Sequence, residues 1–481
     1  MKYNYKVPIF RKWGIMKRII GLIIFCLIVL GGLQVVEAYK DSQLTDSQRE
    51  LKEYFEDEGH VISVLMPEYY YYGNGNYNDL ESVMNIIIMK EFDYDDRVSS
   101  QIIQLDVETR EDYLKEKNLL LSSKEGPTLI MIDLSEESLD DYVDNGVVDN
   151  VSKQLTNYNH IYDFLKHDYF IPLGMYSYGT LVDTDVITDM GEDIPEVSWT
   201  KEDYYELLEI WFEDHDVFVE FNEFDKIYNY YFADSKFMDM TGKVYMNTDE
   251  NLDKVIALRD RFISNDYKID PTKSMAEIKG LIDIQSREDL DAVRGYFMQN
   301  KQDNFLIREY INALHPFSTY HPLLYRPVKL LPTVNKGDTN VSEVGFLVNT
   351  NGQNKEFGIK LLDLFISDKY QYYIYEKKFF SSIAPSIDTI EEQIKSKHPR
   401  QVGDVEKKVP QYAFDTRDQI IEDLSTGDIQ TVRKSRAELI LNRTFKSFVT
   451  EVAFNEEYFT RDQIEQKLKE FEREVYLQIN E

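Results

Sequence analysis

The chain has 481 residues, more than one ordinary hydrophobic core supports, so we expect two lobes or domains. Hydrophobic residues make up 43 % of it, which excludes a disordered chain, and its most unusual feature is 35 Tyr and 27 Phe beside only 3 Trp. The formal net charge of −33 describes a surface that repels phosphate backbones and anionic lipid, so we expect no nucleic-acid partner.

A short apolar segment, residues 19–30, dominates the N-terminal region. It follows Lys17 and Arg18, and the small-residue sequence Val36-Glu37-Ala38 comes after it. This order is typical of a secretory signal peptide, and an uncleaved membrane anchor has the same charge asymmetry. We therefore predict that residues 1–38 are a signal peptide or an N-terminal membrane anchor. The exported protein would then be anchored at the extracellular face of the membrane or secreted.

The only cysteine, Cys26, lies inside this apolar run, so the sequence predicts no disulfide, no thiol nucleophile and no cysteine metal site. Lipid attachment to Cys26 is a third way of anchoring the chain. The residues before it, Ile23, Ile24 and Phe25, lack the small residue expected ahead of a lipidated cysteine. We interpret Cys26 as a passive member of the apolar core.

From residue 61 onward, short apolar runs alternate with helical patterns, which is typical of an α/β architecture. We expect strands at 61–66, 101–107 and 127–134, with helices at 79–90 and 112–122. The third run, PTLIMIDL, is continuously apolar, as a central parallel strand covered on both faces requires. Two later helices should begin at capping boxes, formed by Thr200 with Asp203 and by Thr460 with Gln463.

Several segments, taken in order, resemble the family 1 extracellular solute-binding proteins of ABC importers, which include the maltose-binding protein. The segments are PTLIMIDLSEESLDDYVDNGVVDNVS, IPLGMYSYGTLVDTDVITDMG, EVSWTKEDYYELLEIW, LLPTVNKGD, VGFLVNTNGQNKEFGIKLLDLFIS, SIAPSIDTI and EEYFTRDQIEQKLKEFEREVYLQINE. Each motif is short, and their order and spacing over residues 60–481 carry the resemblance.

The resemblance implies an α/β, two-lobed periplasmic-binding-protein-like fold with discontinuous lobes joined by a hinge and a ligand cleft between them. Residues 171–180 and 331–336 resemble the crossovers between the lobes. Lobe 1 would then comprise 56–173 and 333–372, and lobe 2 would comprise 174–332 and 373–481.

A ligand in this cleft would meet side chains from the ends of strands and from the crossovers. Aromatic rings pack against the C–H faces of sugars, and carboxylates accept hydrogen bonds from their hydroxyls, so the candidates fit a carbohydrate. Two of them have plainer interpretations: the tyrosines at 69–72 as a packed surface loop, and Asp133 as a helix cap at a strand end. The candidate ligand-binding residues are Glu68, Tyr69, Tyr71, Asp133, Tyr176, Tyr178, Phe317 and Tyr320.

The resemblance predicts the ligand less specifically than it predicts the fold. The stretch EYINALHPFSTYHPLLYRP has no Gly or Trp where the family commonly places them. His315 and His321 in that stretch have no metal-ligand spacing, and we expect no metal and no cofactor. The tryptophans Trp199 and Trp211 are expected in the core.

The sequence therefore predicts a non-enzymatic, monomeric receptor that captures a small ligand, a sugar or oligosaccharide, and delivers it to an ABC permease. An anchored extracellular ligand sensor without a transport role is the first alternative. A secreted glycoside hydrolase is the second, although no motif pairs the two carboxylates that such an enzyme needs, and we expect no catalytic residues.

Overall fold

The computed structural model describes residues 59–66, 76–105, 110–123, 126–177, 179–200, 249–263, 306–307, 313–315, 327–332, 341–376, 400–402, 405–407, 409–453 and 459–480, with short runs between 202 and 248. Within these ranges no helix is both long and apolar enough to cross a membrane. Gly59, His60 and Asp93–Ser99 form a small compact unit. The large unit comprises Val61–Phe92 and the described residues from Ser100 onward.

Strands and helices alternate from β1 to α5, and later elements of one kind follow one another. The strands are β1 (His60–Leu65), β2 (Val98–Ile103), β3 (Leu129–Asp133), β4 (Ile171–Tyr176), β5 (Thr180–Asp183), β6 (Leu306–Ile307), β7 (Val328–Leu331), β8 (Ser342–Val348), β9 (Arg400–Val402) and β10 (Val405–Lys407). The helices are α3 (Asn76–Glu91), α4 (Arg110–Ser122), α5 (Leu139–Asp144), α6 (Thr184–Asp189), α9 (Asp249–Ile263), α13 (Lys355–Phe365), α14 (Asp368–Glu376), α16 (Gln411–Thr426), α17 (Arg436–Ala453) and α18 (Arg461–Asn480). The described residues also form the short 3-10 helices η1 (Tyr94–Asp96), η2 (Ser152–Gln154), η3 (Tyr158–His160) and η4 (Asp163–Leu165).

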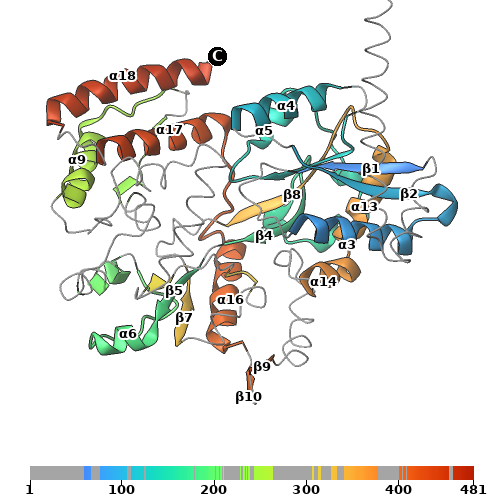
Figure 1. The fold of residues 1–481 in the computed structure, drawn as a ribbon, viewed down its shortest axis with the longest axis horizontal. Helices are drawn as coiled ribbons and strands as arrows, with labels where there is room; N and C mark the ends of the chain where they lie inside the picture. The colour runs from blue at the N-terminus through green and yellow to red at the C-terminus, as the bar shows by residue number, and fades with distance from the viewer. Residues whose placement is uncertain are drawn as a thin grey trace, which may run out of the picture. The chain divides into compact units, whose positions relative to one another are not determined.

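A five-stranded sheet in the order β2-β1-β3-β8-β4 organises the first half of the fold (Figure 1). Every residue of β3 is buried, so the prediction of a central strand at 127–134 is confirmed. This strand runs parallel to β1 but antiparallel to β8, which enters from far along the chain. The expectation of a parallel strand therefore holds on one side only.

The strand expected at 101–107 begins earlier, at Val98, and ends at Ile103. Its polar start is tolerated because Asn85 of α3 accepts hydrogen bonds from both the backbone N and the Oγ of Ser100, at 3.1 and 2.8 Å. Hydrophobic periodicity does not reveal a strand whose polar residues are satisfied by a neighbouring helix.

Helices cover both faces of this sheet, and Figure 1 shows α4 and α5 on one side with α3 and α13 on the other. On the first face, Leu121 and Tyr142 pack with Ile130 and Ile132 of β3. On the second, the ring of Phe365 stacks on Phe346 of β8 with their centroids 5.7 Å apart. The all-apolar β3 follows from this double coverage.

Strands β4 and β8 approach closely because Gly345 has no side chain. A Cβ at Gly345 would lie 2.3 Å from the carbonyl O of Ile171. The register between the two strands shifts at the same place, between Pro172 and Gly174. A glycine at this point therefore lets β4 join the sheet despite its proline.

The second group of elements contains a three-stranded sheet, β6-β5-β7, and a helical core. In that core α17 packs against both α9 and α18, and Figure 1 shows the three helices together. Trp199 is buried in the same cluster and donates from Nε1 to the carbonyl of Pro332 at 3.0 Å, so its predicted place in the core is confirmed. Trp211 lies outside the described residues.

Both predicted capping boxes are present. The backbone N of Thr460 donates to Oε1 of Gln463 at 2.8 Å, just before α18, and the Gln463 N–H returns a bond to the Thr460 hydroxyl. Thr200 and Asp203 make the same reciprocal pair, with the Thr200 N–H donating to the Asp203 carboxylate at 2.6 Å.

The chain passes between the five-stranded and the three-stranded sheet near both segments that resemble crossovers, 171–180 and 331–336. It leaves the five-stranded sheet at Tyr176 and enters the three-stranded sheet at Thr180, and it returns between Leu331 and Ser342. The exact bounds of the two lobes remain a prediction.

Candidate ligand-binding site

The candidate site lies at one edge of the five-stranded sheet, where β3 and β4 end and β8 begins. Asp133 is the last residue of β3 and pairs with Val344, while Tyr176 is the last residue of β4 and pairs with Ser342. Since residues two apart on a strand share a face, Asp133 and Tyr176 project from the same face on either side of β8.

The hydroxyl of Tyr176 reaches across β8 and donates to Oδ2 of Asp133 at 2.5 Å. The other carboxylate oxygen, Oδ1, accepts from the backbone N and the hydroxyl of Ser135, at 2.8 and 2.7 Å. Asp133 is 1 % exposed, whereas Tyr176 is half-buried. The carboxylate thus accepts hydrogen bonds from the tyrosine and from the following turn, and Tyr176 is the more exposed residue of the pair.

Burial raises the pKa of Asp133 to about 6, although the hydrogen bonds from Tyr176 and Ser135 favour the charged form and lower it. Glu136, in the same turn, adds a like charge that raises it further. Asp133 therefore changes protonation close to neutral pH, with its charged form depending on three hydrogen bonds.

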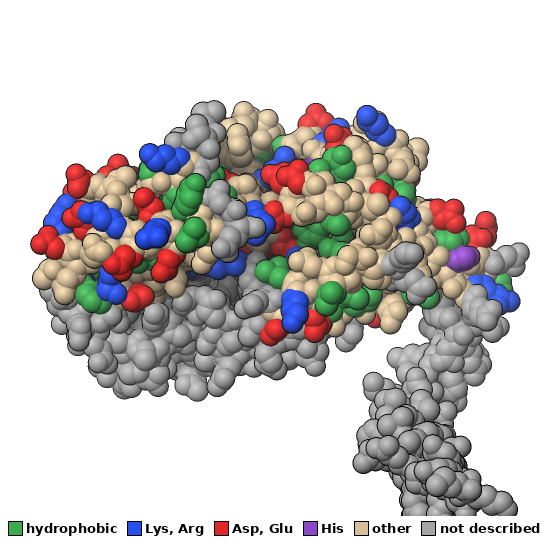
Figure 2. Space-filling model, turned by 90° about the horizontal axis from the view of Figure 1, so that it is seen from above, with side chains coloured by type: hydrophobic (Ala, Val, Ile, Leu, Met, Phe, Trp, Pro, Cys, Tyr) green, Lys and Arg blue, Asp and Glu red, His purple; other side chains and the backbone are tan. Residues whose placement is uncertain are grey.

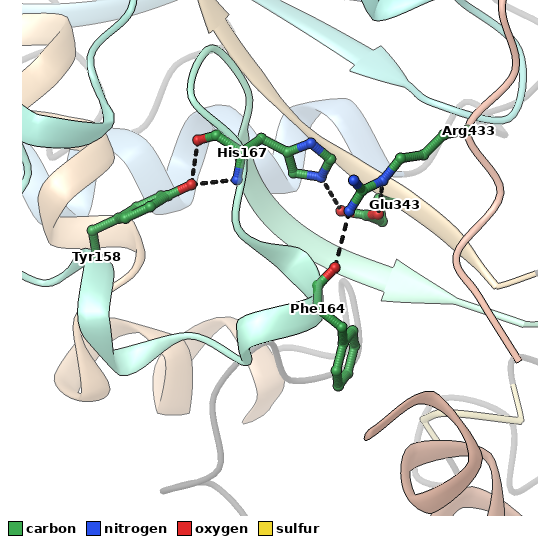
Figure 3. Close-up of polar contacts among 5 residues, drawn as sticks. All are labelled: Tyr158, Phe164, His167, Glu343 and Arg433. Atoms are coloured by element: carbon green, nitrogen blue, oxygen red, sulfur yellow. Dashed lines mark hydrogen bonds and ion pairs between the residues drawn. The ribbon is translucent and has the colours of Figure 1, made fainter. Parts of the chain in front are cut away.

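A second buried carboxylate, Glu343, precedes Val344, the partner of Asp133, and so projects from the opposite face of the same edge. Figure 3 shows its polar partners. Glu343 has no exposed surface and accepts from Nε2 of His167 at 2.8 Å and from Nε of Arg433 at 3.2 Å. Burial raises the pKa of Glu343, but the hydrogen bond from His167 and the charges of His167 and Arg433 outweigh it, so the pKa lies below its usual value.

The partners of Glu343 come from distant segments. His167 precedes β4, and both its backbone groups bond to the hydroxyl of Tyr158 (Figure 3). Arg433 lies between α16 and α17 and also donates to the carbonyl of Phe164 at 2.9 Å. Next to Arg433, the backbone N of Val432 donates to the carbonyl of Val341 at 2.9 Å. These bonds connect the segment between α16 and α17 to the start of β8.

Of the predicted site residues, the structure brings Asp133 and Tyr176 together. The other candidates, Glu68, Tyr69, Tyr71, Tyr178, Phe317 and Tyr320, lie outside the described residues. Because β1 is parallel to β3, its carboxyl end at Met66 points toward the same edge, and the chain that continues into Glu68 leaves from there.

Sequence reasoning missed the Glu343 cluster and a buried group formed by Lys117, Glu137 and Tyr142. One signal was present for Glu343, because it is the single charged residue in the strand sequence SEVGFLV. A lone carboxylate in a strand buried on both faces needs a paired cation. Lys117 carries no such signal, since lysines are common on exposed helix faces.

Within the described residues, no cluster of three His, Cys, Asp or Glu side chains could hold a metal ion. Figure 2 shows acidic and basic side chains interspersed over one face of the molecule. In that view the strong net negative charge does not gather into one acidic field. Exposed ion pairs such as Lys469 with Glu465 on α18 occur among the described residues.

No protein-family model and no curated protein matches the chain. Solved structures do match. An ABC substrate-binding protein from Listeria monocytogenes in complex with cycloalternan has a TM-score of 0.57 at 12 % identity, covering 88 % of this chain and 100 % of that one. An ABC transporter solute-binding protein from Agrobacterium radiobacter K84 in complex with ribitol has a TM-score of 0.57 at 13 % identity, over 87 % and 98 %.

The maltose-bound MalE3 protein of T. maritima has a TM-score of 0.56 at 12 % identity, covering 87 % of this chain and 99 % of that one. At these identities the likeness concerns the fold, and the resemblance expected from the sequence is confirmed at that level. The chain has the two-lobed, mixed α/β fold of the ABC solute-binding proteins.

Proposed function

We propose that the protein is an extracytoplasmic receptor that captures a small carbohydrate and delivers it to the permease of an ABC importer. One observation carries the proposal: the half-buried ring of Tyr176 is held by Asp133 at the sheet edge from which the chain passes to its second sheet. Ligands bind at such edges in open α/β sheets, and an oriented aromatic ring suits the apolar face of a sugar.

The matched proteins support the ligand class, because their structures hold cycloalternan, ribitol and maltose. All three are polyhydroxylated, so the shared requirement is for hydrogen bonds with hydroxyl groups beside an apolar surface. We propose that residues 67–75, which follow β1, complete the ligand contacts through Glu68, Tyr69 and Tyr71, with Tyr178, Phe317 and Tyr320 contributing from the other lobe.

A binding role rather than a catalytic one fits the state of the buried carboxylates. Asp133 already accepts bonds from Ser135 and Tyr176, and Glu343 from His167 and Arg433. A glycosidase needs one carboxyl free to protonate the leaving group and another facing the sugar or a water. Carboxylates saturated by the protein's own donors suit positioning instead.

The test is a thermal-shift screen of the purified protein against maltose, cycloalternan, ribitol, a peptide mixture and polyamines. A ligand at 100 times its dissociation constant adds about 2.7 kcal/mol to the free energy of unfolding, which raises Tm measurably. We expect a rise with one of the carbohydrates. A rise with peptides or polyamines alone would contradict the carbohydrate proposal.

The transport role has a separate test. We expect the protein to be recovered outside the cytoplasm with its N-terminus processed or membrane-anchored, and to bind an ABC permease reconstituted in vesicles when the carbohydrate is present. Binding to a membrane histidine kinase instead of a permease would support the sensor alternative. A full-length cytoplasmic product would contradict export.

A further inference from the structure

Helix α4 carries a lysine that is almost completely buried. Lys117 is 5 % exposed, and its Nζ lies 2.5 Å from Oε2 of Glu137 and 2.9 Å from the hydroxyl of Tyr142. Tyr142 also donates to Glu137, which is itself 8 % exposed. The ammonium group lies over the rings of Tyr113 and Tyr142, 5.2 and 5.1 Å from their centroids. We call Lys117, Glu137 and Tyr142 the buried triad.

The triad lies beside the turn that follows β3. The backbone N of Glu137 donates to the carbonyl of Asp133 at 2.9 Å, and Ser135 in the same turn donates twice to the Asp133 carboxylate. Glu137 therefore fixes the far end of a turn whose near end is Asp133. Holding Glu137 also holds the two Ser135 donors in place.

The same helix also holds the end of β1. Tyr113, one turn before Lys117 on α4, donates from its hydroxyl to the carbonyl of Met66 at 3.1 Å. Helix α4 thus bonds both to Met66, at the end of β1, and to Glu137, in the turn after β3.

A buried ion pair gives little net stability compared with apolar residues of similar volume, because both charges lose their hydration. Its hydrogen bonds have fixed directions, however, so they specify one arrangement of the groups that they join. The triad is therefore better suited to fixing the position of the turn than to stabilising the protein.

We propose that Lys117, Glu137 and Tyr142 are positioning residues that hold the Leu134–Ser138 turn, and through Ser135 the Asp133–Tyr176 pair, in the arrangement that binds ligand. The part of this proposal that concerns affinity rests on the proposed function. The part that concerns the geometry of Asp133 does not depend on any ligand.

The experiment compares the protein with Lys117→Met/Glu137→Leu, which replaces one charge of each sign by apolar side chains. The matched control is Lys469→Met/Glu465→Leu, which removes an exposed lysine–glutamate pair on α18, far from the turn in sequence. For each background, the free energy of unfolding is measured between about pH 3 and 8 with and without Asp133→Asn, so that the difference reports the titration of Asp133.

The groups that act on Asp133 are Tyr176, Ser135 and Glu136. Since the Ser135 bonds favour the charged carboxylate, loss of their alignment should raise the midpoint of the Asp133 titration by about half a pH unit or more. The α18 control should leave the midpoint unchanged. A midpoint that stays unchanged in Lys117→Met/Glu137→Leu would overturn the proposal.

Should the double variant fail to fold, Tyr142→Phe, which removes one hydroxyl, is measured in the same way. A smaller upward shift supports the proposal, and no shift overturns it. Maltose is the probe for affinity, and we expect about a tenfold weaker Kd in the folded variant. If maltose does not bind the parent protein, the carbohydrate proposal fails for this ligand, while the pH measurement still decides the role of the triad.

Discussion

The carboxylates of Asp133 and Glu343 lie at the same sheet edge but on opposite faces. Asp133 pairs with Val344, so Glu343, one residue earlier on β8, projects to the other side. Burial dominates the pKa of Asp133 and raises it to about 6, whereas the bonds and charges of His167 and Arg433 bring the pKa of Glu343 below its usual value. The two groups should therefore give the stability of the protein opposite dependences on pH.

The first prediction concerns Asp133. The native state binds its proton more tightly than the unfolded chain, whose carboxyl titrates near 3.8, so the contribution to stability is largest at low pH. It should decrease by about 3 kcal/mol as the pH rises from about 4 to about 6, and then stay level. Asp133→Asn should abolish this decrease in denaturant unfolding. A parallel pH profile for the parent and the variant would contradict the raised pKa.

The second prediction concerns Glu343. Its pKa in the native state is lowered from 4.5, so the stability that it contributes is fully present above that value and is lost as the pH falls toward the native pKa. Urea unfolding at a series of acidic pH values should show a shallower loss for Glu343→Gln than for the parent. An equally steep loss would mean that other carboxylates account for the acid sensitivity.

The third prediction compares two arginines of similar exposure. The side chain of Arg433 is 46 % exposed and bonds to a fully buried carboxylate, while that of Arg461 is 49 % exposed and pairs with the exposed Asp253. Arg433→Met should lower the free energy of unfolding by about 1–2 kcal/mol, because Glu343 then keeps only part of its charge compensation. Arg461→Met should lower the free energy of unfolding less than Arg433→Met does, because its ion pair with Asp253 is exposed to solvent. Equal effects in urea unfolding would show that Glu343 does not depend on Arg433.

The fourth prediction concerns Tyr176. If its ring packs against a sugar, Tyr176→Ala should weaken carbohydrate binding by about 1–3 kcal/mol, or roughly 5–150-fold in Kd. Tyr176→Phe is the matched control, because it keeps the ring and removes only the hydroxyl bond to Asp133. Calorimetry with the carbohydrate from the thermal-shift screen should place the phenylalanine variant between the parent and the alanine variant. Unchanged affinity in a folded Tyr176→Ala would mean that the ring is not part of the site.

The parts of the fold that the sequence predicts well are those in which local pattern and burial agree. The apolar run of β3, the capping box of α18 and the buried Trp199 needed only the apolar pattern, helix-end chemistry and the usual burial of tryptophan. The start of β2 could not be found in this way, because Ser99 and Ser100 are polar and Asn85, on another element, satisfies Ser100.

The sequence predicted where in the fold the candidate site lies, but it did not predict which side chains contact one another there. Asp133 ends a predicted strand and Tyr176 lies in the predicted first crossover, and the family resemblance placed both near the ligand cleft. Their hydrogen bond depends on β8 lying between β3 and β4, which separates the two strands by about 10 Å, a span that the tyrosine and aspartate side chains cover together. The triad forms only if Lys117 lies on the side of α4 that faces the sheet. The sequence of α4 mixes polar and apolar residues, so it does not predict which side that is.

The position of β8 also affects the order in which the protein can be assembled. β4 has no other partner among the described strands of its sheet, so residues 171–176 stay unpaired until residues 342–348 have been synthesised. Pairing between strands that are far apart in sequence slows folding, and until β8 arrives the apolar strand β4 has no hydrogen-bonded partner strand among those described. If the chain is exported unfolded, as the proposed function requires, this late pairing would be an advantage, because the sheet cannot be completed before residues 342–348 have been synthesised.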